Sequence, residues 1–349
     1  MHPATLVRLL SLLTSTLVHG SLLSPPRRHL EANASGEVKV DPLSEPPKPD
    51  NTKPIEFGTK FDGKLYANGE PFHIKGINWY GTESGLWPPG GMEFHDVDWY
   101  CAFLAKNKFN AIRMLFNHKA VIDDAKADPG WPNAYPVTRG GENTYLQMFL
   151  AVSKIAARHG LMVMMACHRL DKDSWPGKGL WYDESIGVSE AAVMGSWSKI
   201  AAELCAQWNV FAVDLQNEPH ASSWGKGMGE GNDWGHAAER LGNHVMEVCP
   251  RWLVMVEGVG YTPGAPGTDA TMGIWWGENF VGAKTQPVRL KEGHQSKLVY
   301  SPHTYGPSVY MQTYFKDAAF PRNMEQIWSS HFAFVQVSVR TVRVCVKHM

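Results

Sequence analysis

The sequence predicts an α/β fold, a (β/α)8 TIM barrel whose seventh and eighth strands are altered or missing at the C-terminus. From residue 57 onward, short apolar runs alternate with helix-like segments, which is typical of parallel βαβ units. The runs are continuously apolar, so both faces of each strand are expected to be buried. Polar or aromatic residues follow the C-terminal end of one run after another, the position at which barrel proteins carry their functional residues.

The segment before the barrel predicts an exported chain. Residues 1–20 carry Arg8 before an apolar run at 9–18, the pattern of a secretory signal peptide and too short for a membrane span. Residues 21–54 are rich in Pro, Ser and charge without apolar periodicity, which predicts a solvated leader or linker. We therefore expect a secreted, extracellular protein whose folded domain covers residues 55–334.

The folded domain is expected to contain six recognisable strands with helices between them. The strands are expected at residues 73–79, 111–115, 161–166, 210–215, 253–256 and 298–301. The helices are expected to end near residue 107 and to cover about 144–159, 190–208 and 234–248. No glycine-rich phosphate-binding loop follows the first strand, which argues against a nucleotide-binding fold.

Composition narrows the range of partners. The 33 basic and 34 acidic residues leave a formal net charge of −1, so no overall field favours nucleic acid or an anionic membrane surface. Trp is as numerous as Phe, at 14 each, which flat ligands such as sugar rings would explain and which core packing would also explain. The five cysteines lack zinc or thioredoxin spacing, leaving one or two disulfides or buried thiols open.

Glu218 is the first candidate for catalysis. It stands in Asn217-Glu218-Pro219 directly after an apolar strand, where neighbours can tune its pKa, so it is a natural general acid/base. The alternative is that Glu218 is a solvated glutamate at the start of a loop. This alternative is less favoured because other predicted strands also end in polar residues. Those strand-end residues are Asn78, Trp79, Arg113, His168, Asn217, Glu218, Glu257, His303 and Tyr305.

The other strand-end residues suggest support for a charged site. Arg113 lies inside an apolar strand, where it is costly unless a carboxylate pairs with it. His168 and His303 can hold a donor or acceptor, although either could be a satisfied core residue, and Tyr305 can donate to a carboxylate oxygen. No His-x-x-x-His or carboxylate triad has ligand spacing, so we predict neither a metal nor a cofactor.

Seven motifs in order resemble one enzyme family. The chain is similar to glycoside hydrolase family 5, the cellulase family, over about residues 57–330. The motifs that carry the resemblance are residues 76–81 (Gly-Ile-Asn-Trp-Tyr-Gly), 110–113 (Asn-Ala-Ile-Arg), 167–169 (Cys-His-Arg), 215–220 (Leu-Gln-Asn-Glu-Pro-His), 256–259 (Val-Glu-Gly-Val), 275–277 (Trp-Trp-Gly) and 300–305 (Tyr-Ser-Pro-His-Thr-Tyr).

The resemblance implies a retaining, endo-β-1,4-glucanase-like hydrolase that acts on a cellulose-like polysaccharide through two glutamates, with mannan or another β-glucan left open. It implies Glu218 as acid/base, Asn217 as a contact to the sugar 2-hydroxyl, and support from Arg113 and His168. His303 and Tyr305 would orient and tune the nucleophile. The implied substrate-binding residues are Asn78, Trp79, Trp181, Trp275 and Trp276. We expect a monomer.

The C-terminal part departs from the family pattern. A glutamate in a Gly-Glu-Phe-Gly-like seventh strand is expected beyond Tyr305, yet no Asp or Glu follows Glu325. Residues 335–349 are interpreted as foreign to the fold, with a divergent seventh strand as the alternative because Val recurs at every second position. We therefore expect no nucleophile in this chain and a structural or sugar-contacting role for Glu257. Hydrolysis would be lost while glycan binding remains, and a non-catalytic glycan-binding protein is the alternative function.

Overall fold

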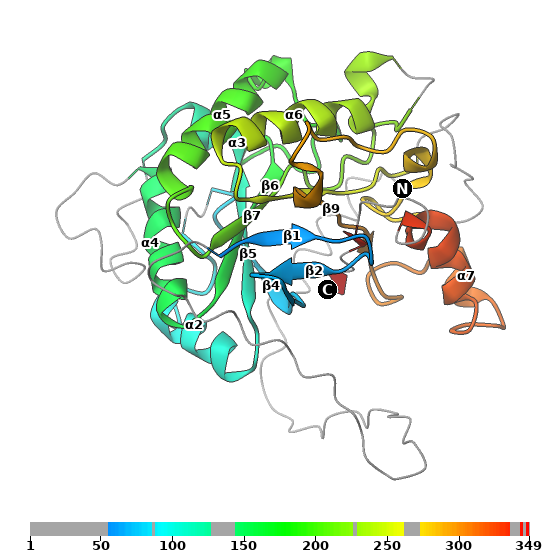
Figure 1. Cartoon of the computed structure of the whole chain (residues 1–349), viewed down its shortest axis with the longest axis horizontal. Coiled ribbons are helices and arrows are strands. Elements are labelled where there is room, and N and C mark those ends of the chain that lie inside the picture. The colour runs from blue at the N-terminus through cyan, green and yellow to red at the C-terminus, as the bar shows by residue number, and fades with distance from the viewer. Residues whose placement is uncertain are drawn as a thin grey trace, which may run out of the picture. The chain divides into compact units, whose positions relative to one another are not determined.

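The computed structural model describes residues 55–85, 88–126, 144–225, 229–261 and 273–335, together with the backbone of residues 343–344 and 347–348. The predicted signal peptide and leader at residues 1–54 lie outside the described residues, as does most of the segment 335–349. Figure 1 shows the strands at the centre of the described part, with α2, α4, α5 and α6 along its outer side.

A parallel sheet forms the centre of the described residues. Its strand order is β11-β9-β8-β7-β6-β5-β4, and each pair of neighbours is parallel. This sequential order is what successive βαβ units produce. The six predicted strands are confirmed. The seven strands of this sheet are β4 (Gly76–Trp79), β5 (Ala111–Asn117), β6 (Met162–Arg169), β7 (Val210–Asp214), β8 (Leu253–Val256), β9 (Leu298–Tyr300) and β11 (Arg343–Val344).

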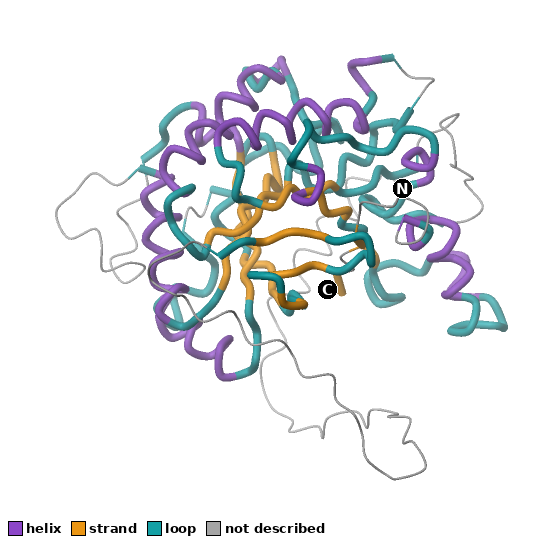
Figure 2. The backbone as a smooth tube through the Cα atoms, in the orientation of Figure 1, coloured by secondary structure: helices purple, strands orange, loops and turns teal. Residues whose placement is uncertain are grey.

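Helices connect the successive strands from β4 to β8, and Figure 2 shows helices outside the orange strands. Asp96, Thr144, Ser189 and Asp233 each precede a helix and accept a backbone N–H of its first turn, which explains why the helices begin there. None of the described helices is long and apolar enough to cross a membrane. The α-helices are α2 (Val97–Lys106), α3 (His118–Ile122), α4 (Tyr145–Arg158), α5 (Glu190–Leu204), α6 (Trp234–Val248) and α7 (Met324–Trp328).

Shorter turns of helix lie in the loops and after α7. These are the 3₁₀ turns η2 (Glu184–Ile186), η3 (Glu230–Asn232), η4 (Val281–Lys284), η5 (Gln295–Lys297) and η6 (Thr313–Lys316), and the π-helix η7 (Ser329–Ala333).

The strands have two buried faces, and each face packs on a different partner. Ile112 and Met114 on β5 belong to the same core cluster as Trp197 on α5, so this face of the strand packs on the helices. Ala111 instead packs in a second cluster with Phe57 of the N-terminal hairpin. The second cluster closes the barrel interior near the N-terminal ends of the strands and leaves their C-terminal ends for the site. The hairpin consists of β1 (Phe57–Thr59), β2 (Leu65–Ala67) and β3 (Glu70–Pro71), all antiparallel.

Two short strands lie in the segment that was interpreted as foreign to the fold. β11 pairs in parallel with β9, and β12 (Lys347–His348) pairs in parallel with β10 (His303–Thr304). Parallel pairing next to β9 is what the alternative, a divergent seventh strand, predicts. Among the described residues no strand connects β11 to β4, so the sheet has two ends there.

The four cysteines that the structure describes take both states that the sequence left open. Cys205, just after α5, forms a disulfide with Cys249, just after α6. Cys101 and Cys167 are buried thiols, and burial raises the pKa of Cys101 to about 12 and that of Cys167 well above its usual range. These two thiols are therefore packing residues that stay protonated at neutral pH.

Candidate active site

Arg113 lies at the centre of a buried ion-pair network at the C-terminal ends of the strands. It follows Ala111 by two positions on β5 and so points to the same interior face. Its guanidinium bonds Asp214 of β7 at 2.8 Å and Glu257, directly after β8, at 3.0 Å. Burial lowers the pKa of Arg113, but the charges of Asp214 and Glu257 outweigh it and raise the pKa overall. Arg113 was predicted to need one carboxylate partner, and the structure gives it two, Asp214 and Glu257.

The same guanidinium positions two asparagines. Arg113 donates to Asn78 Oδ1 of β4 at 3.3 Å and to Asn217 Oδ1 at 3.0 Å. Bonds to residues on β4 and β7, to the residue directly after β8 and to the residue beside Glu218 leave the guanidinium little freedom to rotate. Arg113 therefore fixes Asn217, and with it the start of the loop that carries Glu218.

Glu218 itself has a constrained backbone and a carboxyl group turned to a pocket. Its φ of +47° is uncommon for a residue other than glycine, and its N–H donates to Glu257 Oε2 at 2.8 Å. His303 Nδ1 contacts Glu218 Oε1 at 2.9 Å, and the Tyr305 hydroxyl donates to the same oxygen. Both contacts are on Oε1, so within the described residues Oε2 has no protein partner and is available to a ligand.

The surroundings of Glu218 favour its ionised form. Burial raises the pKa of Glu218, but the hydrogen bonds and charge of His303, the Tyr305 hydroxyl and the charge of Arg113 together lower it below the ordinary value. Burial and the nearby Glu218 carboxylate raise the pKa of Tyr305, so Tyr305 remains a hydrogen-bond donor. At neutral pH the site therefore presents an ionised glutamate with a fixed donor.

His303 bridges the two strand-end glutamates. Its Nδ1 contacts Glu218, while its Nε2 lies 2.9 Å from Glu257 Oε1, and the ring is 1% exposed. Ionised carboxylates only accept hydrogen bonds, so keeping both contacts requires a proton on each ring nitrogen. A bridging imidazolium would stabilise both glutamates as anions.

One group of side chains has spacing that a metal ion could use. Ligand atoms of Asp214, Glu257 and His303 lie within 4.8 Å of one another. Arg113 already bonds both carboxylates of this group and supplies the positive charge that a cation would bring. We therefore assign no metal to this cluster.

A pocket of about 650 Å³ opens beside Glu218, which is the only acidic side chain among its described lining residues. Its walls are mainly aromatic. The lining consists of Trp175, Glu218, Tyr261, Gly273, Ile274, Trp275, Trp276, Tyr305, Val309, Tyr310 and Gln312.

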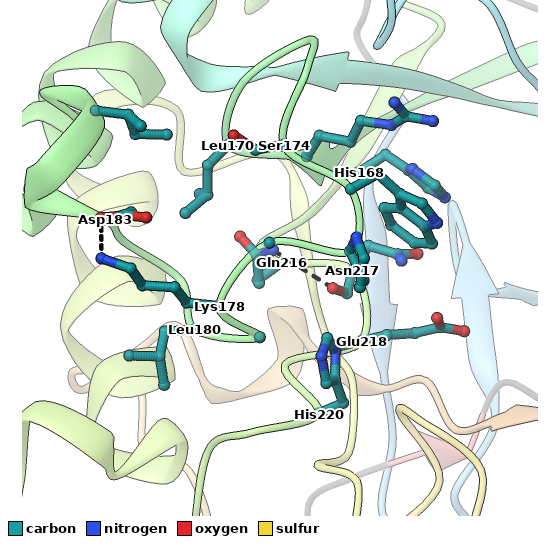
Figure 3. A pocket seen from close by; sticks show the side chains of 16 residues that line it. His168, Leu170, Ser174, Lys178, Leu180, Asp183, Gln216, Asn217, Glu218 and His220 are labelled. Carbon is teal, nitrogen blue, oxygen red and sulfur yellow. Dashed lines mark hydrogen bonds and ion pairs between the residues drawn. The ribbon is translucent and has the colours of Figure 1, made fainter. Parts of the chain in front are cut away.

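A smaller recess of about 20 Å³, enough for about one water molecule, also borders Glu218. Figure 3 shows Asn217 and Glu218 between His168 and His220 there. His168 and Glu218 therefore line the same recess.

The predicted tryptophans differ in position. Trp276 is 40% exposed and lines the large pocket, and Trp275 lines it while being largely buried. Trp79 is 7% exposed, lies outside the lining and donates its indole N–H to Gly90. The prediction for Trp181 is wrong: it is 0% exposed and donates to Glu190, so no ring face is free for a sugar.

Several site residues were missed by the sequence analysis. Asp214 was included in an apolar strand, although its position two residues after the interior Ala212 marks it as pointing inward beside Arg113. Trp175 and Tyr310 lie in loops without periodicity, so no pattern placed them in the pocket. His220 was quoted within a motif but was given no role.

Comparisons with known proteins find similar endoglucanases. An endoglucanase from Paenibacillus polymyxa is 30% identical over 273 residues, covering 77% of this chain and 64% of that protein. The major extracellular endoglucanase of Xanthomonas campestris pv. campestris is 30% identical over 269 residues, covering 76% of this chain and 52% of that protein. The chain thus spans between about half and two thirds of the length of these curated relatives.

Solved structures share the fold. An endocellulase from Pyrococcus horikoshii, crystallised with cellotetraose, aligns with a TM-score of 0.72 and 31% identity over 84% of this chain and 81% of that one. The catalytic domain of the major endoglucanase of Xanthomonas campestris pv. campestris aligns with a TM-score of 0.72 and 28% identity, covering 83% of this chain and 80% of that one. The predicted α/β barrel class is confirmed by this likeness.

The family model named Cellulase (glycosyl hydrolase family 5) matches residues 65–337. Together with the strand-end network around Glu218, this match shows that the chain belongs to the cellulase family, glycosyl hydrolase family 5.

Proposed function

We propose that this site is built for the retaining, two-glutamate hydrolysis of an endo-β-1,4-glucan. In this proposal the chain supplies the glucan-binding surface and the acid/base, Glu218, but not the nucleophile. One observation carries the proposal: Glu218 is the only acidic side chain among the described residues that line an aromatic pocket. The similar endocellulase from Pyrococcus horikoshii was crystallised with cellotetraose, which supports a β-glucan as the ligand.

Glu218 has the geometry of a proton donor to a leaving group. His303 and Tyr305 hold its Oε1, so the free Oε2 would carry the proton to the glycosidic oxygen. Asn217, fixed by Arg113, lies next to the acid and can donate its amide N–H to a sugar hydroxyl. In the second half of the reaction the same carboxylate would take a proton from water.

Among the described residues no second carboxylate lines the pocket beside Glu218. Retaining hydrolysis requires two carboxyl groups about 5–5.5 Å apart on either side of the scissile bond. Glu257 is the nearest candidate, but it is 0% exposed and is bound by Arg113, by His303 and by the N–H of Glu218. It therefore cannot reach an anomeric carbon, and we assign it a structural role.

The lowered pKa of Glu218 has a consequence for rate. A general acid must be protonated when the leaving group departs, whereas Glu218 is held ionised at neutral pH. A second carboxylate close to Glu218 would raise its pKa by like-charge repulsion. Among the described residues no second carboxylate lines the pocket beside Glu218, so in our proposal both the nucleophile and the protonated acid are lacking there.

The compartment is also part of the proposal. The Cys205–Cys249 disulfide is typical of chains that fold in oxidising compartments, which supports secretion together with the signal-like residues 1–20. We propose that the protein acts outside the cell as a monomer. Extracellular recovery of the chain, without residues 1–20 and with this disulfide formed, would test the first part.

The central experiment measures binding and turnover with the same purified 349-residue chain. We expect calorimetry to detect cellotetraose binding, while reducing-sugar assays on carboxymethylcellulose give turnover several orders of magnitude below the roughly 1–1000 s⁻¹ typical of enzymes. Glu218→Gln should leave binding within about threefold of the wild type. Turnover at a rate typical of glycosidases would contradict the missing nucleophile, and no binding to any β-glucan would contradict the proposal as a whole.

Assays with different polysaccharides distinguish the proposed function from two alternative functions. A non-catalytic glycan-binding protein would bind cellulose derivatives in affinity gels and release no product at any pH. A member of the family that acts on mannan or another β-glucan would be retarded more strongly by that polysaccharide than by a cellulose derivative. The aromatic lining at Trp275 and Trp276 is compatible with each, because substrate choice in this fold depends on the loops.

A further inference from the structure

We propose that Trp175 forms a second sugar-stacking surface, on the opposite side of Glu218 from Trp276. This inference rests on the proposed function and adds a subsite to it. A glucan chain lying on both indoles would pass over the carboxyl group with sugar units on either side.

Trp276 shows what such a surface looks like in this chain. Its indole stacks on the His220 ring, with centroids 3.8 Å apart and planes inclined by 13°. A ring stacked on one face and still 40% exposed turns its other face to solvent. That face borders the large pocket, where an apolar sugar face can lie on it.

Trp175 repeats this arrangement from a different loop. Its indole stacks on His168, with centroids 4.8 Å apart and planes inclined by 15°. The guanidinium of Arg169 lies 5.3 Å from the ring centre, which adds a cation–π contact. These contacts hold the indole in one orientation, and it is still 43% exposed and lines the same pocket as Glu218.

The two supporting histidines place the platforms on either side of the acid. Figure 3 shows His168 and His220 on opposite sides of Asn217 and Glu218. His168 belongs to β6, whereas the His220 Nδ1 contacts the backbone oxygen of Glu218 at 2.9 Å. Each indole is stacked on one of these histidines, and both indoles border the pocket that Glu218 lines, which fits a ligand that continues in both directions.

Stacking on a histidine and exposure alone do not define a subsite, and Trp99 provides the matched control. It is 44% exposed and stacks on His95 with centroids 3.6 Å apart and planes inclined by 10°. It lies on α2 and outside the pocket lining. Phe103 also stacks on Trp99, with centroids 5.5 Å apart and planes inclined by 7°. Trp99 is therefore an exposed, histidine-stacked indole like Trp175, but it lies outside the pocket that Glu218 lines.

The test compares Trp175→Ala, Trp276→Ala and Trp99→Ala by calorimetry with cellobiose and cellohexaose. Loss of one aromatic stacking contact should weaken cellohexaose binding by about three- to tenfold in each pocket variant. Trp99→Ala should stay within about twofold of the wild type. Trp175→Phe should recover most of the affinity because it keeps a flat ring, and Trp175→Leu replaces the alanine variant if that one unfolds.

The length of the oligosaccharide shows whether both indoles contact the ligand. Wild-type affinity should rise from cellobiose to cellohexaose because only the longer ligand reaches both indoles, and Trp175→Ala should reduce that rise. If Trp175→Ala behaves like Trp99→Ala while Trp276→Ala weakens binding, the second surface is refuted and the proposed function stands. If the wild type binds neither ligand, both proposals fail.

Discussion

The ends of β7 and β8 each lead into a glutamate, and the two glutamates have opposite environments. Glu257 is 0% exposed, and its two oxygens accept from Arg113 and from the Glu218 N–H. Glu218 is 7% exposed, lines the pocket and keeps one oxygen without a protein partner among the described residues. Both residues are glutamates that follow a strand, Glu257 directly after β8 and Glu218 a short loop beyond β7. The difference in environment lies in the contacts that each carboxylate makes.

This comparison separates structural from reactive carboxylates within one cluster. Arg113 bonds Glu257 directly, whereas it reaches Glu218 only through space and through Asn217. A buried carboxylate whose two oxygens accept from a guanidinium and a backbone N–H stabilises this end of the barrel. Breaking those contacts to bind a ligand would cost free energy. The remaining carboxylate can therefore be offered to a ligand from a fixed backbone.

Removing the shared cation should have the largest effect. Arg113→Met leaves Asp214 and Glu257 buried without their partner, which should cost roughly 3–5 kcal/mol in the free energy of unfolding. Urea unfolding followed by circular dichroism measures this. Arg158→Met is the matched control, because the Arg158–Asp98 pair is exposed and should contribute within about 1 kcal/mol. Equal losses in the two variants would contradict the central role of Arg113.

Exchanging each glutamate for glutamine should give an intermediate effect that separates the two. Glu257→Gln replaces one accepting oxygen by an amide NH₂, so one of its donors loses its partner, and we expect a loss of roughly 1.5–3 kcal/mol. Glu218→Gln retains an acceptor for Tyr305 at the pocket and should cost about 1 kcal/mol or less. Denaturant midpoints at pH 7 measure both.

The order of these two losses is the informative result. If Glu218→Gln is the more destabilising, then Glu218 is the structural carboxylate and the proposed roles are reversed. Cellotetraose binding by both variants provides the second readout, because Glu257→Gln should weaken it only as far as it loosens the loop that carries Glu218.

Much of the scaffold could be predicted because its signals are local. Continuous apolar runs ended in polar residues at β5 and β7, and this pattern located the strands and the edge where Arg113 and Glu218 meet. Asp214 was hidden inside one of these runs, and only the inward direction shared with Ala212 reveals it. Its role depends on a partner 101 residues away, which no local pattern contains.

The aromatic surfaces were predicted less well, because tertiary packing decides which indoles are buried. Trp181 was expected to stack on a sugar, but it lies against Trp234, with ring centroids 5.9 Å apart, and has no exposed face. Trp175 was not singled out, and it is exposed beside Glu218. A tryptophan count predicts that flat surfaces exist, whereas the loop conformation determines where they are.

The smallest predicted effect concerns acid stability and isolates Glu218 from the other carboxylates. The pKa of Glu218 is lower in the folded chain than the ordinary value of 4.5, so its ionised form stabilises the fold above that pH and this stabilisation is lost as the pH falls through the folded pKa. Each tenfold difference in proton affinity between the folded and unfolded states is worth about 1.4 kcal/mol. Stability measured by urea unfolding from pH 6 down to pH 3 should therefore fall less steeply in Glu218→Gln than in the wild type.

Asp98, Asp183 and Glu190 also have lowered pKa values, but they are common to both proteins and cancel in the difference. A steeper fall in the variant would mean that Glu218 is protonated in the folded state, which would favour a working general acid.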